Sequence, residues 1–420
     1  MFPEEISVIE HPFFQRLRNI KQLGFSEYVF PGATHSRYLH SIGVLEVATR
    51  AFDQLFKHLP DTNEKKRLKE TVRMACLLHD IGHAPLSHTT EFVMPNVSEL
   101  QLPNHFVEDN TRQATHEDYT IKSIIDSSFT SSFTKVVNKF GITHEQVAEL
   151  IIGRTKSDDY FTINNVNYFP LLHQLVSSEM DCDRMDYLLR DSYFCGVSYG
   201  KFDLDWIIDN LRVCQNNGKA FIGISERAVA TFDDFLLCRY HMFMMVYFHY
   251  KAVCLEKVLE RYFMTSSNEY TIPANIEQYL EYDDHHLMKH LKNSQNIWAQ
   301  RVVTNNIPQK VFEAFGQSNI EKLKTLETFL KNNSIDYIKC SSEGRLSKYY
   351  SANMENPHDF PLKVISESAL TKFQFATKDI NNATDLFEKF SRAHTVSRLH
   401  CDFENLKPNI QKEILNIIEK

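Results

Sequence analysis

The sequence predicts a mainly α-helical protein with a smaller C-terminal region of mixed α/β or α+β structure. Only 12 glycines and 13 prolines occur in 420 residues, which favours long helices over a turn-rich β architecture. Apolar residues recur at helical spacing through the first part of the chain, whereas short alternating runs appear only near its end. We therefore expect a helical domain over residues 1–265 and a C-terminal helical and mixed α+β region over residues 266–420.

Helical periodicity and capping patterns place the individual helices. Apolar spacing predicts helices over residues 36–51, 64–79, 170–193 and 231–262. Thr115 and Thr143 are each followed three residues later by Asp118 and Gln146, a pattern typical of helix starts. The polar stretch between these helices, residues 93–115, is expected to be a loop.

The C-terminal region mixes two kinds of pattern. Residues 284–294 and 308–316 have helical spacing, whereas residues 334–339 and 397–403 alternate as strands do. A small sheet packed with helices is therefore expected there.

Composition limits the classes of protein. The chain is 43% hydrophobic and 24% charged, which is typical of a globular protein with a sizeable core. Its 46 basic and 54 acidic residues give a net charge of −8, so phosphate binding would need a local positive pocket or a metal ion. The absence of a long basic block disfavours general nucleic-acid binding.

The cysteines and the apolar runs predict a cytoplasmic protein that does not bind membranes. The eight cysteines form no Cys-x-x-Cys pair, and several lie in apolar helical runs, as free thiols in a reducing compartment do. The N-terminus lacks the features of a signal peptide. The most apolar run, residues 242–248, is far shorter than the roughly 20 residues needed to span a bilayer.

The segment that carries most chemical information is residues 77–88, with the sequence LLHDIGHAPLSH. His79 and Asp80 offer an imidazole nitrogen and a carboxylate oxygen, a set that suits Mn, Fe, Co, Ni or Zn better than Mg. Two other metal-like groups have less convincing surroundings. The His358-Asp359 dipeptide follows a proline and is expected on a surface loop, and residues 283–286 (DDHH) are expected to be a solvated helix start.

Two further residues of metal-binding type lie on apolar helix faces. His40 is aligned with Val44 and Val47, and Asp183 lies between Met180 and Tyr187, where an unpaired carboxylate is costly. Each residue also has an ordinary structural explanation. His40 is also explained as a core histidine bonded to backbone, and Asp183 as part of a salt bridge with a nearby arginine.

The order His40, His79-Asp80, Asp183 resembles the H…HD…D signature of the HD-domain metal-dependent phosphohydrolases. The resemblance runs from about residue 10 to residue 315 and favours the deoxynucleoside triphosphate triphosphohydrolase branch of that family. It is carried by four linked segments, residues 14–24, 29–35, 78–88 and 183–191. It implies a helical HD-domain core.

The resemblance implies a metal site and a catalytic group. The implied ligands of a divalent ion (Mn, Fe, Ni, Co, Zn or Mg) are His40, His79, Asp80 and Asp183, and a second Mg could enter with the substrate. His83, His88 and His116 match histidines along the family's phosphate path, and Glu91 stands where an aspartate orients the histidine matching His116. From the residues alone, Glu91 is equally an ordinary first-turn carboxylate and His116 a surface residue beside a helix cap.

The resemblance also implies substrate contacts. Arg37 matches a phosphate-binding arginine, and Gln22 and Leu23 match a pair that lies against the sugar. The full set of implied substrate-binding residues is Gln22, Leu23, Arg37, Arg184, Tyr187, Asp191, Arg239 and Tyr247. Phe243 and Phe248 depart from the family pattern. A vertebrate member of the family has histidine and glutamine at these two positions, which lie near the nucleobase.

Three functions are carried forward. The first is metal-dependent hydrolysis of deoxynucleoside triphosphates to deoxynucleosides and inorganic triphosphate. The second keeps the site but changes the substrate, giving a nucleotidase, a phosphodiesterase or an exonuclease acting on RNA ends. The third is a nucleotide-binding regulator. The resemblance further implies a homo-oligomer, a dimer or tetramer, and Arg16 and Arg18 match part of a nucleotide-effector site.

Overall fold

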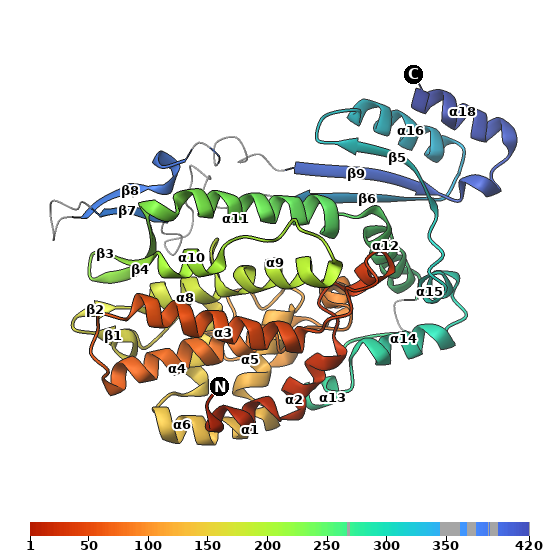
Figure 1. Cartoon of the computed structure of the whole chain (residues 1–420). Coiled ribbons are helices and arrows are strands. Elements are labelled where there is room, and N and C mark those ends of the chain that lie inside the picture. Colours follow the sequence, from red (N-terminus) through yellow and green to blue (C-terminus); the bar gives the residue numbers. More distant parts are fainter. Residues whose placement is uncertain (267–268, 345–361, 368–374, 385, 387–393, 420) are drawn as a thin grey trace.

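The structure is a computed structural model that describes residues 1–420 except 267–268, 345–361, 368–374, 385, 387–393 and 420. The His358-Asp359 dipeptide lies outside the described residues, so its expected place on a surface loop stays a prediction. The expected fold class, mainly helical with a smaller mixed region near the C-terminus, is confirmed (Figure 1).

The first half of the chain folds into a bundle of helices. Its helices are α1 (Ile6–Ile9), α2 (Pro12–Gln15), α3 (Arg37–Leu55), α4 (Asn63–Leu78), α5 (His116–Ile125), α6 (Thr134–Phe140), α7 (His144–Ile152), α8 (Phe169–Val176) and α9 (Cys182–Cys195). Helix α3 packs against both α4 and α9, and the three run side by side across the molecule (Figure 1). The expected capping box at Thr115 opens α5, and Thr143 caps α7 by accepting a hydrogen bond from the Gln146 amide.

The second half continues with helices that pack along the bundle and at one end of it, and with two that belong to the C-terminal unit (Figure 1). They are α10 (Leu204–Asp209), α11 (Val229–Met242), α12 (Tyr250–Thr265), α13 (Ile276–Tyr279), α14 (Asp284–Asn293) and α15 (Ile297–Val303), followed by α16 (Ile320–Asn332) and α18 (Pro408–Glu419). Short 3-10 turns are η1 (Pro3–Glu5), η2 (Arg16–Asn19), η3 (Gly24–Tyr28), η4 (Ser87–Val93), η5 (Val97–Leu100), η6 (Ser128–Phe133), η7 (Asp158–Phe161), η8 (Glu226–Ala228), η10 (Ile380–Asn382) and η11 (Phe403–Asn405). None of the described helices is long and apolar enough to cross a membrane.

Two of the helices expected from periodicity are in fact interrupted. The helix expected over 170–193 breaks after α8, because the Asp181 carboxylate accepts the Ser178 and Arg184 amides and starts α9 afresh. The helix expected over 231–262 passes into a π-helical turn, η9 (Phe243–Tyr247), and restarts at α12, which His249 caps. Continuous apolar spacing therefore concealed two polar helix starts.

A six-stranded sheet covers one side of the bundle and was missed from the sequence. Its strands are β1 (Thr162–Ile163), β2 (Val166–Asn167), β3 (Leu211–Asn216), β4 (Lys219–Ser225), β7 (Lys363–Glu367) and β8 (Phe375–Asp379). The order is β1-β2-β4-β7-β8, with β3 paired to β4 as an antiparallel hairpin. Asn217 and Gly218, both with positive φ, form the hairpin turn. An Asn-Gly pair between apolar runs is a strong hairpin signal that sequence analysis had overlooked.

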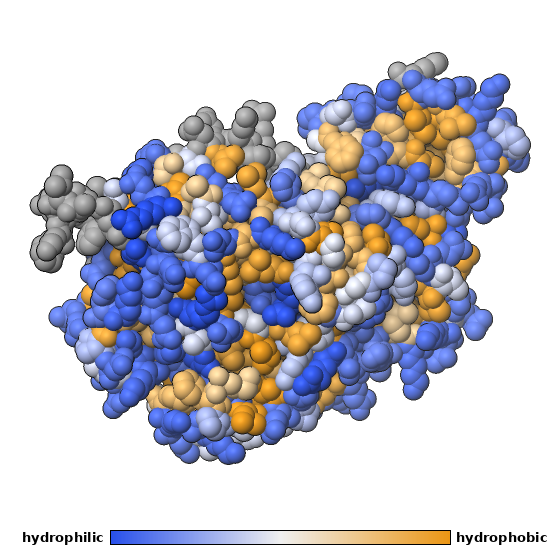
Figure 2. Space-filling model, viewed as in Figure 1, coloured by the Kyte–Doolittle hydropathy of each residue, from blue (hydrophilic) through white to orange (hydrophobic). Residues whose placement is uncertain are grey.

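The C-terminal unit has its own small core. Strands β5 (Gln309–Phe315), β6 (Tyr337–Gly344) and β9 (His394–Cys401) form an antiparallel sheet in the order β5-β9-β6, with α16 and α18 beside it (Figure 1). Strand pairing with β9 overrides the local helical spacing, so the expectation of a helix over 308–316 is wrong. Figure 2 shows a mostly hydrophilic face, with apolar residues gathered between the helices of the bundle and on the C-terminal unit.

Candidate metal centre and catalytic cleft

Four side chains from three helices meet at the centre of the bundle. His40 comes from α3, His79 and Asp80 follow the end of α4, and Asp183 lies in the first turn of α9. Asp183 Oδ1 is 2.9 Å from His40 Nε2 and 3.6 Å from His79 Nε2. Asp80 Oδ1 is 3.4 Å from His79 Nε2. The structure thus brings His40, His79, Asp80 and Asp183 together, and we call these four residues the metal-type centre.

The two histidines of the metal-type centre are held in a form suited to metal binding. His40 Nδ1 donates to Asp186 Oδ2 at 2.8 Å, and His79 Nδ1 donates to the Cys76 carbonyl at 2.8 Å. Nδ1 of each ring is therefore committed to a protein acceptor, and Nε2 is the nitrogen left to bind a metal. Both Nε2 atoms are buried and lack a hydrogen-bond partner of normal geometry. Two oriented imidazole lone pairs beside two carboxylates fit a divalent cation, and one nitrogen from each histidine lies within 4.8 Å of an Asp183 oxygen.

The pKa values of the two histidines indicate that the carboxylates make the metal-type centre strongly negative. Burial opposes protonation of His40, but hydrogen bonds to Asp183 and Asp186 raise its pKa to about 10. Burial likewise opposes protonation of His79, but Asp80 and Asp183 raise its pKa to about 9. The carboxylates create a negative site that attracts protons when no metal cation offsets their charge.

Asp186 was missed from the sequence although it orients His40. Arg190 binds both of its oxygens, through Nε at 2.7 Å and Nη2 at 2.8 Å. Gly43 on α3 makes this approach possible, because a Cβ there would come within 1.9 Å of Asp186 Oδ1. The available signal was spacing, since Asp186 follows Asp183 by one helical turn and precedes Arg190 by another.

Asp80 connects the metal-type centre to its surroundings. It is 4% exposed, pairs with the Arg37 guanidinium and lies 3.1 Å from His83 Nε2. Although burial opposes ionisation, the Arg37 charge, reinforced by His79, holds the pKa of Asp80 well below its usual range. Arg37 also donates to the Ser87 hydroxyl at 3.0 Å, which fixes its guanidinium plane at the mouth of the centre.

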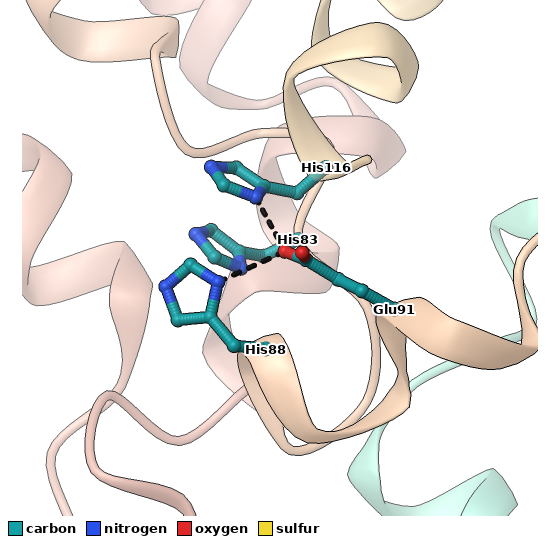
Figure 3. A group of neighbouring side chains, drawn as sticks. All are labelled: His83, His88, Glu91 and His116. Carbon is teal, nitrogen blue, oxygen red and sulfur yellow. Dashed lines mark hydrogen bonds and ion pairs between the residues drawn. The ribbon is translucent and has the colours of Figure 1, made fainter. Parts of the chain in front are cut away.

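A second histidine cluster is drawn in Figure 3, and its His83 reaches Asp80 of the metal-type centre. Glu91 Oε1 accepts from His116 Nδ1 at 2.5 Å and from His88 Nδ1 at 2.9 Å. The rings of His83 and His116 stack with centroids 3.9 Å apart. Burial opposes ionisation of Glu91, but the two imidazoles lower its pKa to about 2, so the carboxylate stays charged. We call His83, His88, Glu91 and His116 the Glu91 group.

The turn that carries these histidines packs against α5 without a side chain in between. A Cβ on Gly82 would come within 2.2 Å of both the His116 carbonyl and the Thr120 amide. Thr120 Oγ1 accepts from the Gly82 amide and donates to the His79 carbonyl, at 3.0 and 3.1 Å. Glycine at position 82 is therefore what lets His83 and His116 stack.

The same turn is fastened from a distant part of the chain. Leu86 and Ser87 have φ of +54° and +60°, a left-handed conformation that is costly for residues with side chains. Asp284 accepts from the Leu86 amide at 2.7 Å and from the Lys21 amide at 2.9 Å. Residues 283–286 do begin a helix as expected, but Asp284 is 4% exposed, so the expectation of a solvated start is wrong there.

Arg16 supports the turn from another side. Its guanidinium donates to the His83 carbonyl at 2.8 Å and to the Tyr282 carbonyl at 2.9 Å, and it lies over the Tyr279 ring. Tyr279 in turn donates to the Gly82 carbonyl at 2.9 Å. Arg16, which matches part of an effector site in the family, is buried here and holds the turn that carries His83.

The expected substrate contacts gather around a cavity of about 370 Å³ in front of both clusters. Seven of the eight line it, namely Gln22, Leu23, Arg37, Arg184, Tyr187, Asp191 and Tyr247. Arg239 lies behind this lining and pairs with the buried Glu179. A neighbouring cavity of about 410 Å³ shares Gln22, Leu23, Arg37, His88 and Tyr247 with the first. Together the two have the volume range of small-molecule sites.

Two of the expected contacts are held by protein partners. Asp191 accepts from Tyr247 at 2.8 Å through one oxygen and lies 2.8 Å from His35 Nε2 through the other. Arg184 pairs with Asp181, the residue that caps its own helix. These bonds orient Tyr247 and Arg184 at the cavity wall before any substrate arrives.

Comparison with known protein families matches two successive regions. Residues 37–190 match the family described as HD domain, and residues 202–314 match the HD associated region. The first match begins at Arg37 on α3 and ends at Arg190 on α9, so it contains the whole metal-type centre and the Glu91 group. Together the two matches cover more than half of the chain.

Among curated proteins, the chain is similar to the uncharacterized protein YwfO of Bacillus subtilis, with 36% identity over 253 residues. That match covers 59% of this chain and 49% of YwfO. The deoxynucleoside triphosphate triphosphohydrolase SAMHD1 of Xenopus laevis is 26% identical over 324 residues, which cover 73% of this chain and 50% of that protein. The chain thus spans about half the length of these two relatives.

Solved structures share the fold over nearly the whole chain. A hypothetical protein from Aquifex aeolicus has a TM-score of 0.73 and 25% identity, with 99% of this chain and 96% of that chain covered. A phosphohydrolase from Bacteroides thetaiotaomicron has a TM-score of 0.64 and 23% identity, with 94% of each chain covered. With the matched domains and the site geometry, these likenesses establish that the chain belongs to the HD superfamily of metal-dependent phosphohydrolases.

Proposed function

We propose that this cleft hydrolyses deoxynucleoside triphosphates to a deoxynucleoside and inorganic triphosphate. The observation that carries the proposal is the pairing of two sites with different chemistry in one cleft. The metal-type centre presents unpaired imidazole nitrogens beside carboxylates, and the Glu91 group presents carboxylate-bound imidazoles next to it. Similarity to SAMHD1, whose name states this activity, supports the choice of substrate.

His40, His79, Asp80 and Asp183 would hold a divalent ion. When bound, such an ion supplies an activated water molecule and offsets negative charge on phosphorus. The protein's own part is to present the ligands correctly. Asp186 and the Cys76 carbonyl bind Nδ1 of the two histidines and so direct each Nε2 toward the ion, and Arg37 keeps Asp80 ionised.

His116 is suited to protonate the leaving group. In the proposed reaction the oxygen of water bonds to the α-phosphorus, the bond between this phosphorus and the nucleoside 5′-oxygen breaks, and that oxygen takes a proton. Because His116 Nδ1 is bound to Glu91, its Nε2 is the atom left to deliver the proton. The Glu91 carboxylate stabilises the protonated ring before transfer.

The remaining side chains would position the nucleotide. Arg37 stands between the two cavities, where a guanidinium can contact phosphate oxygens. Tyr187 and Tyr247 lie with ring centroids 6.2 Å apart on the wall that also carries Asp191, and they offer an aromatic surface for the sugar and base. Gln22 and Leu23 close the opposite side, where we expect little room for a 2′-hydroxyl.

A product assay tests the proposal. The protein would be incubated with each deoxynucleoside and ribonucleoside triphosphate, with Mn²⁺, Mg²⁺, Ni²⁺, Co²⁺, Fe²⁺ or Zn²⁺, and the products identified by chromatography and mass. We expect deoxynucleoside and triphosphate in equal amounts. Water labelled with ¹⁸O should leave its label in triphosphate, because water attacks phosphorus.

The alternatives give different products. Orthophosphate, pyrophosphate or nucleoside monophosphates from nucleotides, or mononucleotides from RNA ends, would assign the site to a nucleotidase, phosphodiesterase or exonuclease. Nucleotide binding by calorimetry with no turnover under any metal would assign it to a regulator. The expected homo-oligomer and nucleotide effector remain predictions, which sedimentation with and without nucleotide would test.

A further inference from the structure

A second cluster of metal-binding side chains lies away from the cleft, where α12 meets the C-terminal sheet. Cys254 is on α12, Cys340 on β6 and His400 on β9. All three are buried, with exposed fractions of 0%, and one ligand atom from each lies within 4.8 Å of the others. The proposed hydrolysis uses none of these residues.

His400 has the same arrangement that makes His79 a candidate ligand. Its Nδ1 donates to the Pro308 carbonyl at 3.2 Å, which leaves Nε2 deprotonated. Nε2 is buried and lacks a hydrogen-bond partner of normal geometry. A histidine whose outer nitrogen is fixed by a backbone carbonyl, and whose inner nitrogen faces two sulfurs, has the orientation of a metal ligand.

The strand register places the two β-sheet ligands on one face. Cys340 is opposite Arg398, and His400 is opposite Ile338, two residues along each strand. Paired residues in antiparallel strands share a face, as do residues two apart, so Cys340 and His400 both face α12. Cys401, the next residue, points the other way into the core of the C-terminal unit.

The surroundings balance charge at the cluster. Arg398 lies on the same face, and its guanidinium is paired with the Glu313 carboxylate. Two cysteine thiolates would therefore be the main uncompensated charge, and a divalent ion would neutralise both. Binding forms two metal–sulfur bonds and one metal–nitrogen bond, and releases the two thiol protons to solvent.

We propose that Cys254, Cys340 and His400 bind a thiophilic d¹⁰ metal ion that fastens the C-terminal sheet to α12. Two sulfurs and one imidazole select Zn²⁺ or Cu⁺ over Mg²⁺, Ca²⁺ or Mn²⁺. The ligands come from three elements far apart in the sequence, so the ion would add a cross-link where α12 packs against β6. The role is structural, and it stands whether or not the cleft hydrolyses nucleotides.

Cobalt substitution tests this site without interference from the cleft. Thiolate ligands give Co²⁺ a strong charge-transfer absorption in the near ultraviolet, and the metal-type centre contains no cysteine. Reduced full-length protein carrying Asp183→Ala, which disables the metal-type centre, should develop this band to one equivalent per chain when titrated with Co²⁺. Added Zn²⁺ should bleach it.

The variants make the assignment specific. Cys254→Ser and Cys340→Ser should each remove most of the band, and His400→Ala should weaken Co²⁺ binding at least about tenfold, by analogy with the loss of ligand support in other sites. Cys401→Ser and Cys214→Ser are matched controls, because both are buried cysteines outside the cluster, and they should keep the full band. A band that survives both Cys254→Ser and Cys340→Ser would overturn the proposal.

Stability and metal content can also be measured on a chain that keeps all three ligands, so the test does not depend on whether the ligand variants fold. In the Asp183→Ala background, Zn²⁺ should raise the melting temperature of the otherwise unaltered chain by about 3–5 °C. Elemental analysis after dialysis should find one Zn²⁺ per chain, or one copper after loading with Cu⁺ under reducing conditions, which tells the two ions apart. No retained metal of either kind, or a Cys254–Cys340 disulfide in protein isolated with reductant, would contradict the proposal.

Discussion

The metal-type centre and the Glu91 group use the same side chain for different purposes. In the metal-type centre each imidazole has its own Nδ1 acceptor, Asp186 for His40 and the Cys76 carbonyl for His79, and each Nε2 is unpaired. In the Glu91 group, His88 and His116 share one carboxylate oxygen. In the proposed reaction the first arrangement would present lone pairs to a cation, and the second would present a proton to the substrate.

The two clusters differ in the charge around the Nδ1 acceptor. His79 binds a neutral carbonyl and the Asp186 carboxylate that binds His40 is itself bound by Arg190, whereas the Glu91 carboxylate is shared by two imidazoles. His83 stands between the two clusters, stacked on His116 and 3.1 Å from Asp80. Burial, with Arg37 and His116 nearby, lowers the pKa of His83 well below its usual range, so it is neutral.

The largest expected effect comes from Asp183→Ala, which removes the carboxylate shared by His40 and His79. Retained metal should be lost, and turnover should fall by about 10³-fold or more, because charge stabilisation by a metal contributes several kcal/mol. Elemental analysis and the product assay measure both. Asp233→Ala is the matched control, a half-buried helical aspartate that accepts from Thr384. Full activity in Asp183→Ala would disprove the metal assignment.

His116→Ala should separate the two clusters. Losing the proton donor should lower kcat by about 10²–10³-fold while metal content stays that of the unaltered protein. His144→Ala is a close control, because His144 also opens a helix directly after a capping threonine. If His116→Ala also lost its metal, the division between a metal site and a proton-transfer site would be wrong.

Asp186→Ala should weaken the metal site without removing a ligand. His40 would lose the acceptor that fixes its Nδ1 proton, and metal affinity should fall by about 10–100-fold. A competition titration with a chelator measures this, and added metal should restore turnover. Gly43→Ala should act in the same direction, because its methyl group would displace the Asp186 carboxylate. Asp126→Ala, at an exposed aspartate paired with Lys122, should change nothing.

Asp284→Asn should destabilise the turn that carries His83 and His88, although Asp284 itself lies outside that turn. One of the two backbone amides held by Asp284 would face an NH₂ group, and an unsatisfied buried donor costs about 1–3 kcal/mol. We expect a lower melting temperature and a kcat reduced about tenfold, with metal content unchanged. Asp283→Ala separates this role from helix capping, because Asp283 is the cap of α14 and alanine removes the capping oxygen. Equal effects of both variants would show that helix stability alone is responsible.

Much of the site was accessible from the sequence because its signals are local. His79 and Asp80 are adjacent, and helical periodicity put His40 and Asp183 on apolar faces, but it was the family resemblance that joined the four as one set of ligands. These four residues do lie together in the structure. Capping patterns at Thr115 and Thr143 correctly located two helix starts. Their chemical roles remain predictions.

What the sequence did not reveal depends on distant packing. Asp284 lies 198 residues from the Leu86 amide that it holds, and no local pattern distinguishes it from its neighbour Asp283, which caps the helix. Strand β5 has helical spacing and becomes a strand only because β9 pairs with it. Cys254, Cys340 and His400 lie in separate elements, so their convergence is visible only in three dimensions.

The smallest expected effect is a pH dependence of stability centred on Glu91. Its pKa falls from 4.5 to about 2 on folding, because hydrogen bonds from His116 and His88 outweigh burial. A lowered pKa stabilises the fold fully above pH 4.5 and loses that contribution as pH falls through 2. The unaltered protein should therefore exceed Glu91→Gln in urea midpoint at pH 5, and by a shrinking amount as the pH falls below about 4.5. Glu117→Gln, at the residue after His116, should follow the unaltered protein throughout. A stability gap that widened as the pH fell below about 4.5 would mean that Glu91 is protonated in the folded state, and it could not then hold His116 as a proton donor.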